Sequence, residues 1–325
     1  MSKRAIILSG GGSKGAWGVG VVKALFNQGI TYQIGIGTST GSLMAPFILA
    51  GAIDELEQGY TSVNQDDIFN VNPFKNDGGI KGLQAAFRLI GGKKTLGESV
   101  RLREKIEELV SNAFFTKIRN EEKLFGATVA NLNKGVSEVK TTDQYSDAEM
   151  KDWIWASANN PLFMSSFEFT ESNGQTYSYA DGGITNYANV EYVILNRPKE
   201  LTHIDVIFHN TREVIQEGFD NNSGILSRLL RTLDMFSADA NKNDLVEARL
   251  RTQLLENDVH LTIYYMNDED VISITGESRN TLLFDKQRMQ VGVMRGNYAI
   301  ESGTIDKDEC IISCTDGRVH LQTTP

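Results

Sequence analysis

The chain has 325 residues, of which 40% are hydrophobic and 23% charged, so it is long enough to bury an ordinary globular core. Its net charge of -10 argues against a nucleic-acid partner, which would require a basic face. Any contact with lipid is expected to be local and apolar. The two cysteines, Cys310 and Cys314, are predicted to be free thiols. Without a signal peptide or an apolar run of about 18 residues, the sequence predicts a soluble cytoplasmic protein.

The first fifty residues predict a strand, a helix, a second strand and a second helix. A short apolar run over 5–8 indicates a buried strand, and apolar residues at helical spacing indicate a helix over 14–27. A second strand is predicted over 34–37. A helix that is apolar on nearly every side is predicted over 42–52, which places it in the interior. This alternation is typical of a parallel α/β sheet.

The rest of the chain predicts more helices and a few strands, without an internal repeat or a linker. Residues 54–120 are expected to be mostly helical, with a charged helix over 99–115. The further predicted elements are a hairpin of 125–130 and 136–141, a short helix over 153–158, strands over 204–208 and 259–266, and helical stretches over 225–255 and 281–301. We therefore expect one domain spanning 1–325.

The glycines at the end of the first strand resemble a nucleotide-binding motif. Gly10, Gly12 and Gly15 form G-x-G-x-x-G between a strand and a helix, as in dinucleotide-binding folds. Such folds also need an acidic residue at the end of the second strand to bind the ribose. The first acidic residue of this chain is Asp54, beyond the second helix. A P-loop is excluded as well, because no G-K-[ST] follows the glycines.

The second strand ends in a candidate nucleophile. Residues 37–41 read Gly-Thr-Ser-Thr-Gly, a G-x-S-x-G pattern placed between a strand and an apolar helix. Such a turn exposes the hydroxyl of Ser39, and the following helix directs its positive end at that oxygen. Consecutive backbone N–H groups of Gly10, Gly11 and Gly12 are expected at the neighbouring strand end, where they suit an oxyanion. On the residues alone, a capping serine in a glycine-rich turn stays open.

A base for this serine has to come from a distant part of the chain. The four histidines, His203, His209, His260 and His320, lie in unremarkable contexts. Asp181 opens an Asp-Gly-Gly sequence, in which the two glycines allow a carboxylate loop to approach another backbone. A desolvated aspartate within hydrogen-bond reach can deprotonate serine directly. By itself, however, Asp-Gly-Gly is also a simple turn.

The glycine loop, the G-x-S-x-G turn and Asp181-Gly182-Gly183 together resemble the patatin-like phospholipase family in order and spacing. The resemblance covers about residues 4–210. It implies a three-layer α/β/α sandwich with a central, mostly parallel sheet. It also implies hydrolysis of lipid acyl esters without a cofactor, with Ser39 as nucleophile, Asp181 as base and Gly10, Gly11 and Gly12 as the oxyanion loop. A phospholipid substrate and transient contact with a membrane surface follow from the same resemblance.

Several alternatives remain open at this stage. An α/β-hydrolase triad of Ser39, Asp181 and His203 or His209 fits the chain order. A non-catalytic lipid-binding protein and an enzyme that transfers the acyl group to an alcohol are also compatible with the motifs. Residues 211–325 are expected to complete or cover the core, and a regulatory ligand or partner could act there.

Two further features of the segment before Asp181 have no assigned catalytic role. Residues 156–158 resemble the family's A-S-x-A-x-P stretch but depart from it by one residue. The apolar side chains of Trp153, Trp155, Phe163 and Met164 could line an acyl pocket, although packing in the core is the favoured interpretation.

Overall fold

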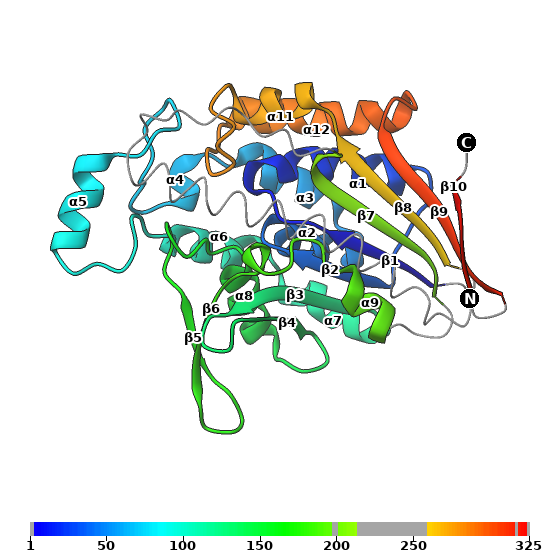
Figure 1. Cartoon of the computed structure of the whole chain (residues 1–325), viewed down its shortest axis with the longest axis horizontal. Coiled ribbons are helices and arrows are strands. Elements are labelled where there is room, and N and C mark those ends of the chain that lie inside the picture. The colour runs from blue at the N-terminus through cyan, green and yellow to red at the C-terminus, as the bar shows by residue number, and fades with distance from the viewer. Residues whose placement is uncertain (1–2, 197–200, 213–258, 316–317, 324–325) are drawn as a thin grey trace.

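A computed structural model describes residues 3–196, 201–212, 259–315 and 318–323 of the chain (Figure 1). Its strands are β1 (Lys3–Leu8), β2 (Ile34–Thr38), β3 (Leu124–Asn131), β4 (Val136–Thr141), β5 (Phe167–Thr170), β6 (Thr176–Asp181), β7 (Leu201–Thr211), β8 (Val259–Met266), β9 (Asp306–Thr315) and β10 (Arg318–Thr323). The described helices are α1 (Gly15–Asn27), α2 (Thr40–Ala50), α3 (Ile53–Ser62), α4 (Gln65–Ile68), α5 (Gly82–Ile90), α6 (Val100–Leu109), α7 (Asn112–Asn120), α8 (Asp147–Ser157), α9 (Val190–Asn196), α11 (Asp268–Thr275) and α12 (Lys286–Glu301).

The strands form one sheet with a parallel centre. Its order is β10-β9-β8-β7-β1-β2-β3-β6-β5, and β4 pairs with β3 beside this path. The five strands from β8 to β3 are parallel, while the pairs at both edges are antiparallel. The chain runs from β1 to β2 and β3 on one side and returns as β7 on the other side of β1. Ligands of such sheets bind at this kind of reversal, beyond the carboxyl ends of the strands.

Helices cover both faces of the sheet. Along β1, the side chains of Ile6 and Leu8 join a large apolar cluster that includes α1, α2 and α12, and Figure 1 shows α11 and α12 lying along this side. The alternating side chains of Ala5 and Ile7 join a second cluster that includes α9. A strand buried on both faces reads as a continuous apolar run, as observed for 5–8. The predicted three-layer α/β/α fold with a mostly parallel central sheet is confirmed.

Most predicted elements up to residue 211 occur where the sequence placed them. The strands over 5–8, 34–37 and 204–208, the first two helices and the hairpin of β3 and β4 are all present. The predicted single helix over 99–115 was wrong, because the chain breaks there into α6 and α7. The hydroxyl of Ser111 accepts a hydrogen bond from the N–H of Ala113 and so begins a new helix.

Two other helix boundaries were misplaced. The helix predicted over 153–158 begins six residues earlier, at Asp147, because Ser146 and Glu149 form a reciprocal capping box. The helix predicted from residue 281 begins at Lys286, after Asp285 caps it. In both cases the capping residues were visible in the sequence, and the apolar spacing alone did not reveal them.

The C-terminal part adds to the sheet. The predicted strand over 259–266 is β8, which pairs in parallel with β7, and β9 and β10 follow it at the edge. The helical stretch predicted over 225–255 lies outside the described residues, as does the side chain of Cys314. The organisation of 1–325 as one domain stays a prediction. Among the described helices, none is long and apolar enough to cross a membrane.

Candidate active site

Ser39 occupies a strained turn between β2 and α2. Its backbone has a φ of 54° and a ψ of -121°, a conformation that residues other than glycine rarely adopt. The turn is tight because α2 crosses directly over β1: a Cβ at Gly41 would lie 2.2 Å from the carbonyl oxygen of Leu8. Since α2 begins at Thr40, the positive end of its dipole lies at Ser39. These features match the nucleophile elbow that the sequence predicts.

Asp181 lies directly beside this serine. The hydroxyl of Ser39 donates a hydrogen bond of 2.8 Å to Oδ2 of Asp181, and the N–H of Gly183 donates one of 2.8 Å to Oδ1. Asp181 ends β6, which pairs with β3. A Cβ at Gly182 would lie 2.3 Å from the carbonyl oxygen of Thr128, so only glycine allows the loop to approach β3 this closely. The structure therefore brings Ser39 and Asp181 together.

The surroundings of Asp181 increase the basicity of its carboxylate. Burial of the carboxylate raises its pKa to about 6, against the opposing effect of the hydrogen bonds from Gly183 and Ser39. A carboxylate with this pKa is still ionised at neutral pH, and it accepts a proton more readily than an exposed aspartate.

Ser157 is a contact that the sequence analysis missed. The backbone N–H of Ser39 donates a hydrogen bond of 2.9 Å to Oγ of Ser157, which in turn donates one of 2.6 Å to the carbonyl oxygen of Thr128. The carbonyl oxygen of the neighbouring Asn159 accepts a hydrogen bond from the N–H of Asp181. The segment resembling A-S-x-A therefore holds the backbones of both Ser39 and Asp181, and this resemblance was the signal that could have revealed it.

The glycine loop after β1 lies next to Ser39. A Cβ at Gly10 would be 3.5 Å from the Cβ of Ser39, and Gly12 lines the same pocket as Ser39. The N–H of Gly10 donates a hydrogen bond of 3.1 Å to the carbonyl oxygen of Tyr187, and that of Ser13 donates one of 2.8 Å to Thr281. Gly11 and Gly12 lie between Gly10 and Ser13 in the chain, and their N–H groups form no backbone hydrogen bond with a described residue.

The histidines proposed for a triad do not lie between Ser39 and Asp181. His203 is near the amino end of β7, opposite Arg4 of β1, and its ring stacks on that of His260. His209 is buried under the glycine loop, where Nδ1 lies 2.8 Å from the carbonyl oxygen of Ser9 and therefore carries a proton. Burial lowers the pKa of His209 to about 4. Among the described residues, no imidazole is hydrogen-bonded to either Ser39 or Asp181.

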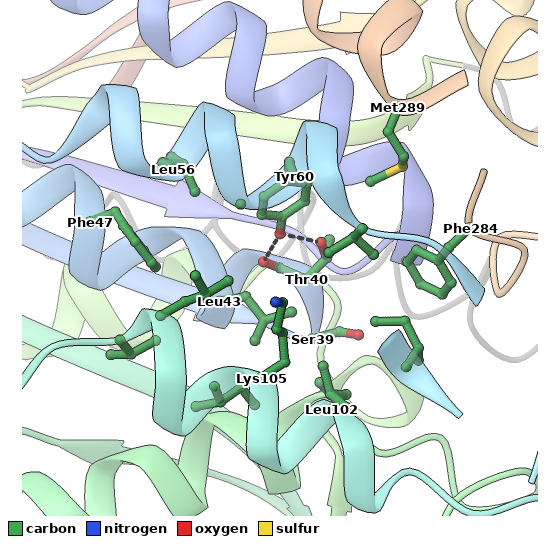
Figure 2. A pocket seen from close by; sticks show the side chains of 18 of the residues that line it. Ser39, Thr40, Leu43, Phe47, Leu56, Tyr60, Leu102, Lys105, Phe284 and Met289 are labelled. Atoms are coloured by element: carbon green, nitrogen blue, oxygen red, sulfur yellow. Dashed lines mark hydrogen bonds between the residues drawn. The ribbon is translucent and has the colours of Figure 1, made fainter. Parts of the chain in front are cut away.

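An apolar pocket opens at Ser39 (Figure 2). The volume available in it to the centre of a water-sized sphere is about 90 Å³, and the pocket is partly open to solvent. The hydroxyl of Tyr60 donates to the carbonyl oxygen of Thr40 and also pairs with its hydroxyl. The apolar side chains lining it come from α2, α3, α4, α6, the segment after α8 and the C-terminal part: Leu43, Phe47, Leu56, Val63, Ile68, Leu102, Ile106, Leu109, Val110, Ala158, Met164, Leu282, Phe284 and Met289.

The apolar residues singled out before Asp181 divide between the pocket and the core. Met164 lines the pocket. Phe163 packs on Phe74, and the buried Trp153 contacts the rings of several aromatic neighbours. These neighbours are Tyr145, Phe167, Phe169 and Tyr179. For Trp153 and Phe163, the favoured interpretation of core packing is confirmed.

The strain at Ser39 predicts a measurable effect on stability. The variant Ser39→Gly is expected to have a free energy of unfolding about 1 kcal/mol higher than Ser39→Ala, because glycine adopts this backbone conformation without strain. Both variants lose the hydroxyl, so their difference isolates the backbone contribution. Urea denaturation of the two proteins measures it. A lower stability of Ser39→Gly than of Ser39→Ala, which the greater freedom of glycine in the unfolded chain would cause by itself, would show that the turn stores no strain.

Comparisons with known proteins bear on the family. The family model described as patatin-like phospholipase matches residues 6–194, more than half of the chain. No curated protein has a significantly similar sequence. The chain is similar to the crystal structure of VipD from Legionella pneumophila, with a TM-score of 0.40 and 15% sequence identity over 95% of this chain and 68% of that chain. The family assignment rests on the family model, which spans the glycine loop, Ser39 and Asp181. This chain belongs to the patatin-like phospholipase family.

Proposed function

We propose that the protein is a lipid acyl hydrolase that cleaves fatty acyl esters through an acyl-enzyme on Ser39. The observation that carries the proposal is the direct hydrogen bond from the Ser39 hydroxyl to the buried Asp181 carboxylate, at the mouth of an apolar pocket. The family relationship supports a lipid substrate. A cytoplasmic location stays a prediction from the sequence.

In the first half of the reaction, Asp181 acts as the base. Its Oδ2 accepts the proton of Ser39 while the serine oxygen attacks the ester carbonyl carbon. The tetrahedral intermediate then collapses, the bond to the alcohol breaks, and the leaving alkoxide takes the proton from Asp181. The fatty acyl group remains bound to Ser39 as an ester.

The negative oxygen of the intermediate needs hydrogen-bond donors. Of the three glycines proposed for this role, Gly10 already donates its N–H to Tyr187, so the proposal narrows to the N–H groups of Gly11 and Gly12. The dipole of α2 adds a favourable field at the same place. Removal of one such donor typically raises the barrier by about 3 kcal/mol.

In the second half, water replaces the alcohol. Asp181 accepts a proton from the water molecule while the water oxygen attacks the acyl-enzyme. When the fatty acid leaves, Asp181 returns this proton to Ser39. The pocket favours a fatty acyl group, because most of its walls are apolar, Tyr60 and Thr40 bond to each other, and the ammonium of Lys105 is paired with Glu108. Burial of methylene groups there contributes roughly 0.8 kcal/mol each to binding.

The rate of covalent labelling tests this assignment. A fluorophosphonate is expected to modify Ser39, and peptide mapping by mass spectrometry identifies the site. Because only ionised Asp181 can accept the serine proton, the labelling rate should fall about tenfold per pH unit below pH 6 and level off above it. Ser39→Ala is the control and should remain unlabelled. A rate that stays constant down to pH 4 would exclude Asp181 as the base.

A further inference from the structure

The helix α5 projects from the body of the molecule. Figure 1 shows it at one end of the molecule, carried by two connecting segments. The backbones of Val71 and Glu98 pair and close the base of this excursion. The two helices on either side of it, α4 and α6, contribute Ile68 and Leu102 to the wall of the pocket. Any surface to which α5 binds is therefore close to this wall of the pocket.

The polar side of α5 faces the protein. Gln84 donates a hydrogen bond to the carbonyl oxygen of Asn72, and Arg88 donates one of 3.0 Å to that of Thr95. Arg88 also forms an ion pair of 3.0 Å with Glu98. These bonds fix the rotation of the helix about its own axis. In a helix at the surface of a globular protein, the apolar side normally faces the core instead.

The apolar side of α5 consequently faces outward. Leu83, Phe87 and Ile90 are 75%, 64% and 83% exposed, and their spacing of four and three residues places them on one face. Three large neighbouring side chains in water are unfavourable unless another apolar phase covers them.

The segment that carries α5 is rich in basic residues, and Lys93 lies beside Leu83 and Phe87. Residues 75–94 contain a single acidic residue, Asp77, and five basic residues, in a chain whose net charge is -10. Lys75, Lys93 and Lys94 are exposed, and none of them forms an ion pair with another described residue. A short amphipathic helix with an outward apolar face and adjacent lysines is complementary to an anionic lipid surface, which offers both acyl chains and negative phosphates.

We propose that α5 docks the protein on anionic membranes, with Leu83, Phe87 and Ile90 inserted among the acyl chains and the lysines at the lipid phosphates. The purpose of this contact rests on the proposed function, since it places the α4 and α6 wall of the pocket beside the substrate. The contact itself requires no catalysis and can be measured separately.

Vesicle flotation tests the docking. The inactive variant Ser39→Ala is used in place of wild type, so that the lipids remain intact. We expect it to float with vesicles of phosphatidylcholine and phosphatidylglycerol in equal parts. The additional changes Leu83→Gln, Phe87→Gln and Ile90→Gln, which preserve helix propensity, should lower the partition coefficient at least tenfold. Pure phosphatidylcholine vesicles should bind at least tenfold less of the Ser39→Ala protein.

A matched control is available on α12. Its Met294 and Tyr298 are 70% and 66% exposed, and Met294→Gln with Tyr298→Gln should leave flotation unchanged. An equal loss in both sets of variants would overturn the proposal, as would equal binding to neutral vesicles. The proposal would also be overturned if the protein does not float and instead forms a dimer in size-exclusion chromatography that the α5 changes abolish. That result would assign this face to a second copy of the chain.

The α5 changes, introduced into a protein with an intact Ser39, test the docking role separately from the proposed hydrolase function. Hydrolysis of vesicle phospholipid should fall at least tenfold, whereas hydrolysis of a soluble short-chain ester should not change. If neither substrate is hydrolysed even by wild type, the proposed function fails, and flotation still decides the role of α5. Loss of both activities in the α5 variant alone would contradict a role confined to docking.

Discussion

Replacement of Ser39 by Ala, or of Asp181 by Asn, should lower kcat for ester hydrolysis by roughly 10⁴-fold or more. The first change removes the attacking oxygen, and the second removes the acceptor of its proton. Because the two side chains act as one unit through a 2.8 Å hydrogen bond, the double variant should be no slower than the slower single variant. Release of fatty acid from a soluble short-chain ester, followed at pH 8, measures all three.

The stability of Asp181→Asn provides the control for this experiment. Burial raises the pKa of Asp181 above its value in the unfolded chain, so the folded state gains most where the carboxyl is protonated and loses this gain as pH rises through about 6. The asparagine variant should therefore be more stable than wild type at pH 8, by about 2 kcal/mol or less, and the advantage should disappear near pH 4. Activity of Asp181→Asn within tenfold of wild type would move the base to another residue.

Filling the pocket should lower kcat/KM for esters with a long acyl chain and leave it nearly unchanged for esters with a short one. Gly59 of α3 lines the pocket, and a Cβ there would meet only the side chain of Leu109, at 3.5 Å. The variant Gly59→Leu should therefore place its side chain in the pocket without disturbing the helix. If it displaces about three methylene groups, kcat/KM for a palmitoyl ester should fall roughly 50-fold. The value for an acetyl ester should stay within a factor of two or three.

The matched control for this experiment is Gly59→Ala, which adds one carbon atom and should reduce kcat/KM for the palmitoyl ester by only a few-fold. Both changes replace a glycine inside a helix and should raise stability by about 0.5–1 kcal/mol, so a folding defect would not explain a loss of activity. An equal loss on the acetyl ester in Gly59→Leu would show that the pocket does not receive the acyl chain.

The sequence predicted the parts of the site that depend on short segments. A strand, a turn and a helix within about ten residues determine where Ser39 lies, and each left a local signal in the glycines and in the apolar pattern. The glycine loop follows the same rule. Asp181 is distant in the chain, and its contact with Ser39 was predicted only through the family resemblance, since Asp-Gly-Gly alone is also a turn.

The pocket could not be predicted in this way. Its wall combines residues such as Leu43, Leu102 and Phe284, which are separated by long stretches of sequence and look like ordinary apolar residues of their helices and loops. Their joint exposure to one cavity follows from how helices pack on the sheet, which periodicity does not specify. The outward face of α5 was missed for a related reason, because the pattern of an amphipathic helix does not state which side meets the protein.

One side of the pocket comes from a part of the chain that lies beyond the family model. The family model ends at residue 194, after the glycine loop, Ser39 and Asp181, yet Leu282, Phe284 and Met289 close one side of the pocket from beyond it. The carbonyl oxygen of Thr281 also accepts a hydrogen bond from Ser13, next to the glycine loop. Under the proposed function, a change in the segment around 281–289 would therefore act on the choice of fatty acid and also, through Thr281, on the position of the glycine loop.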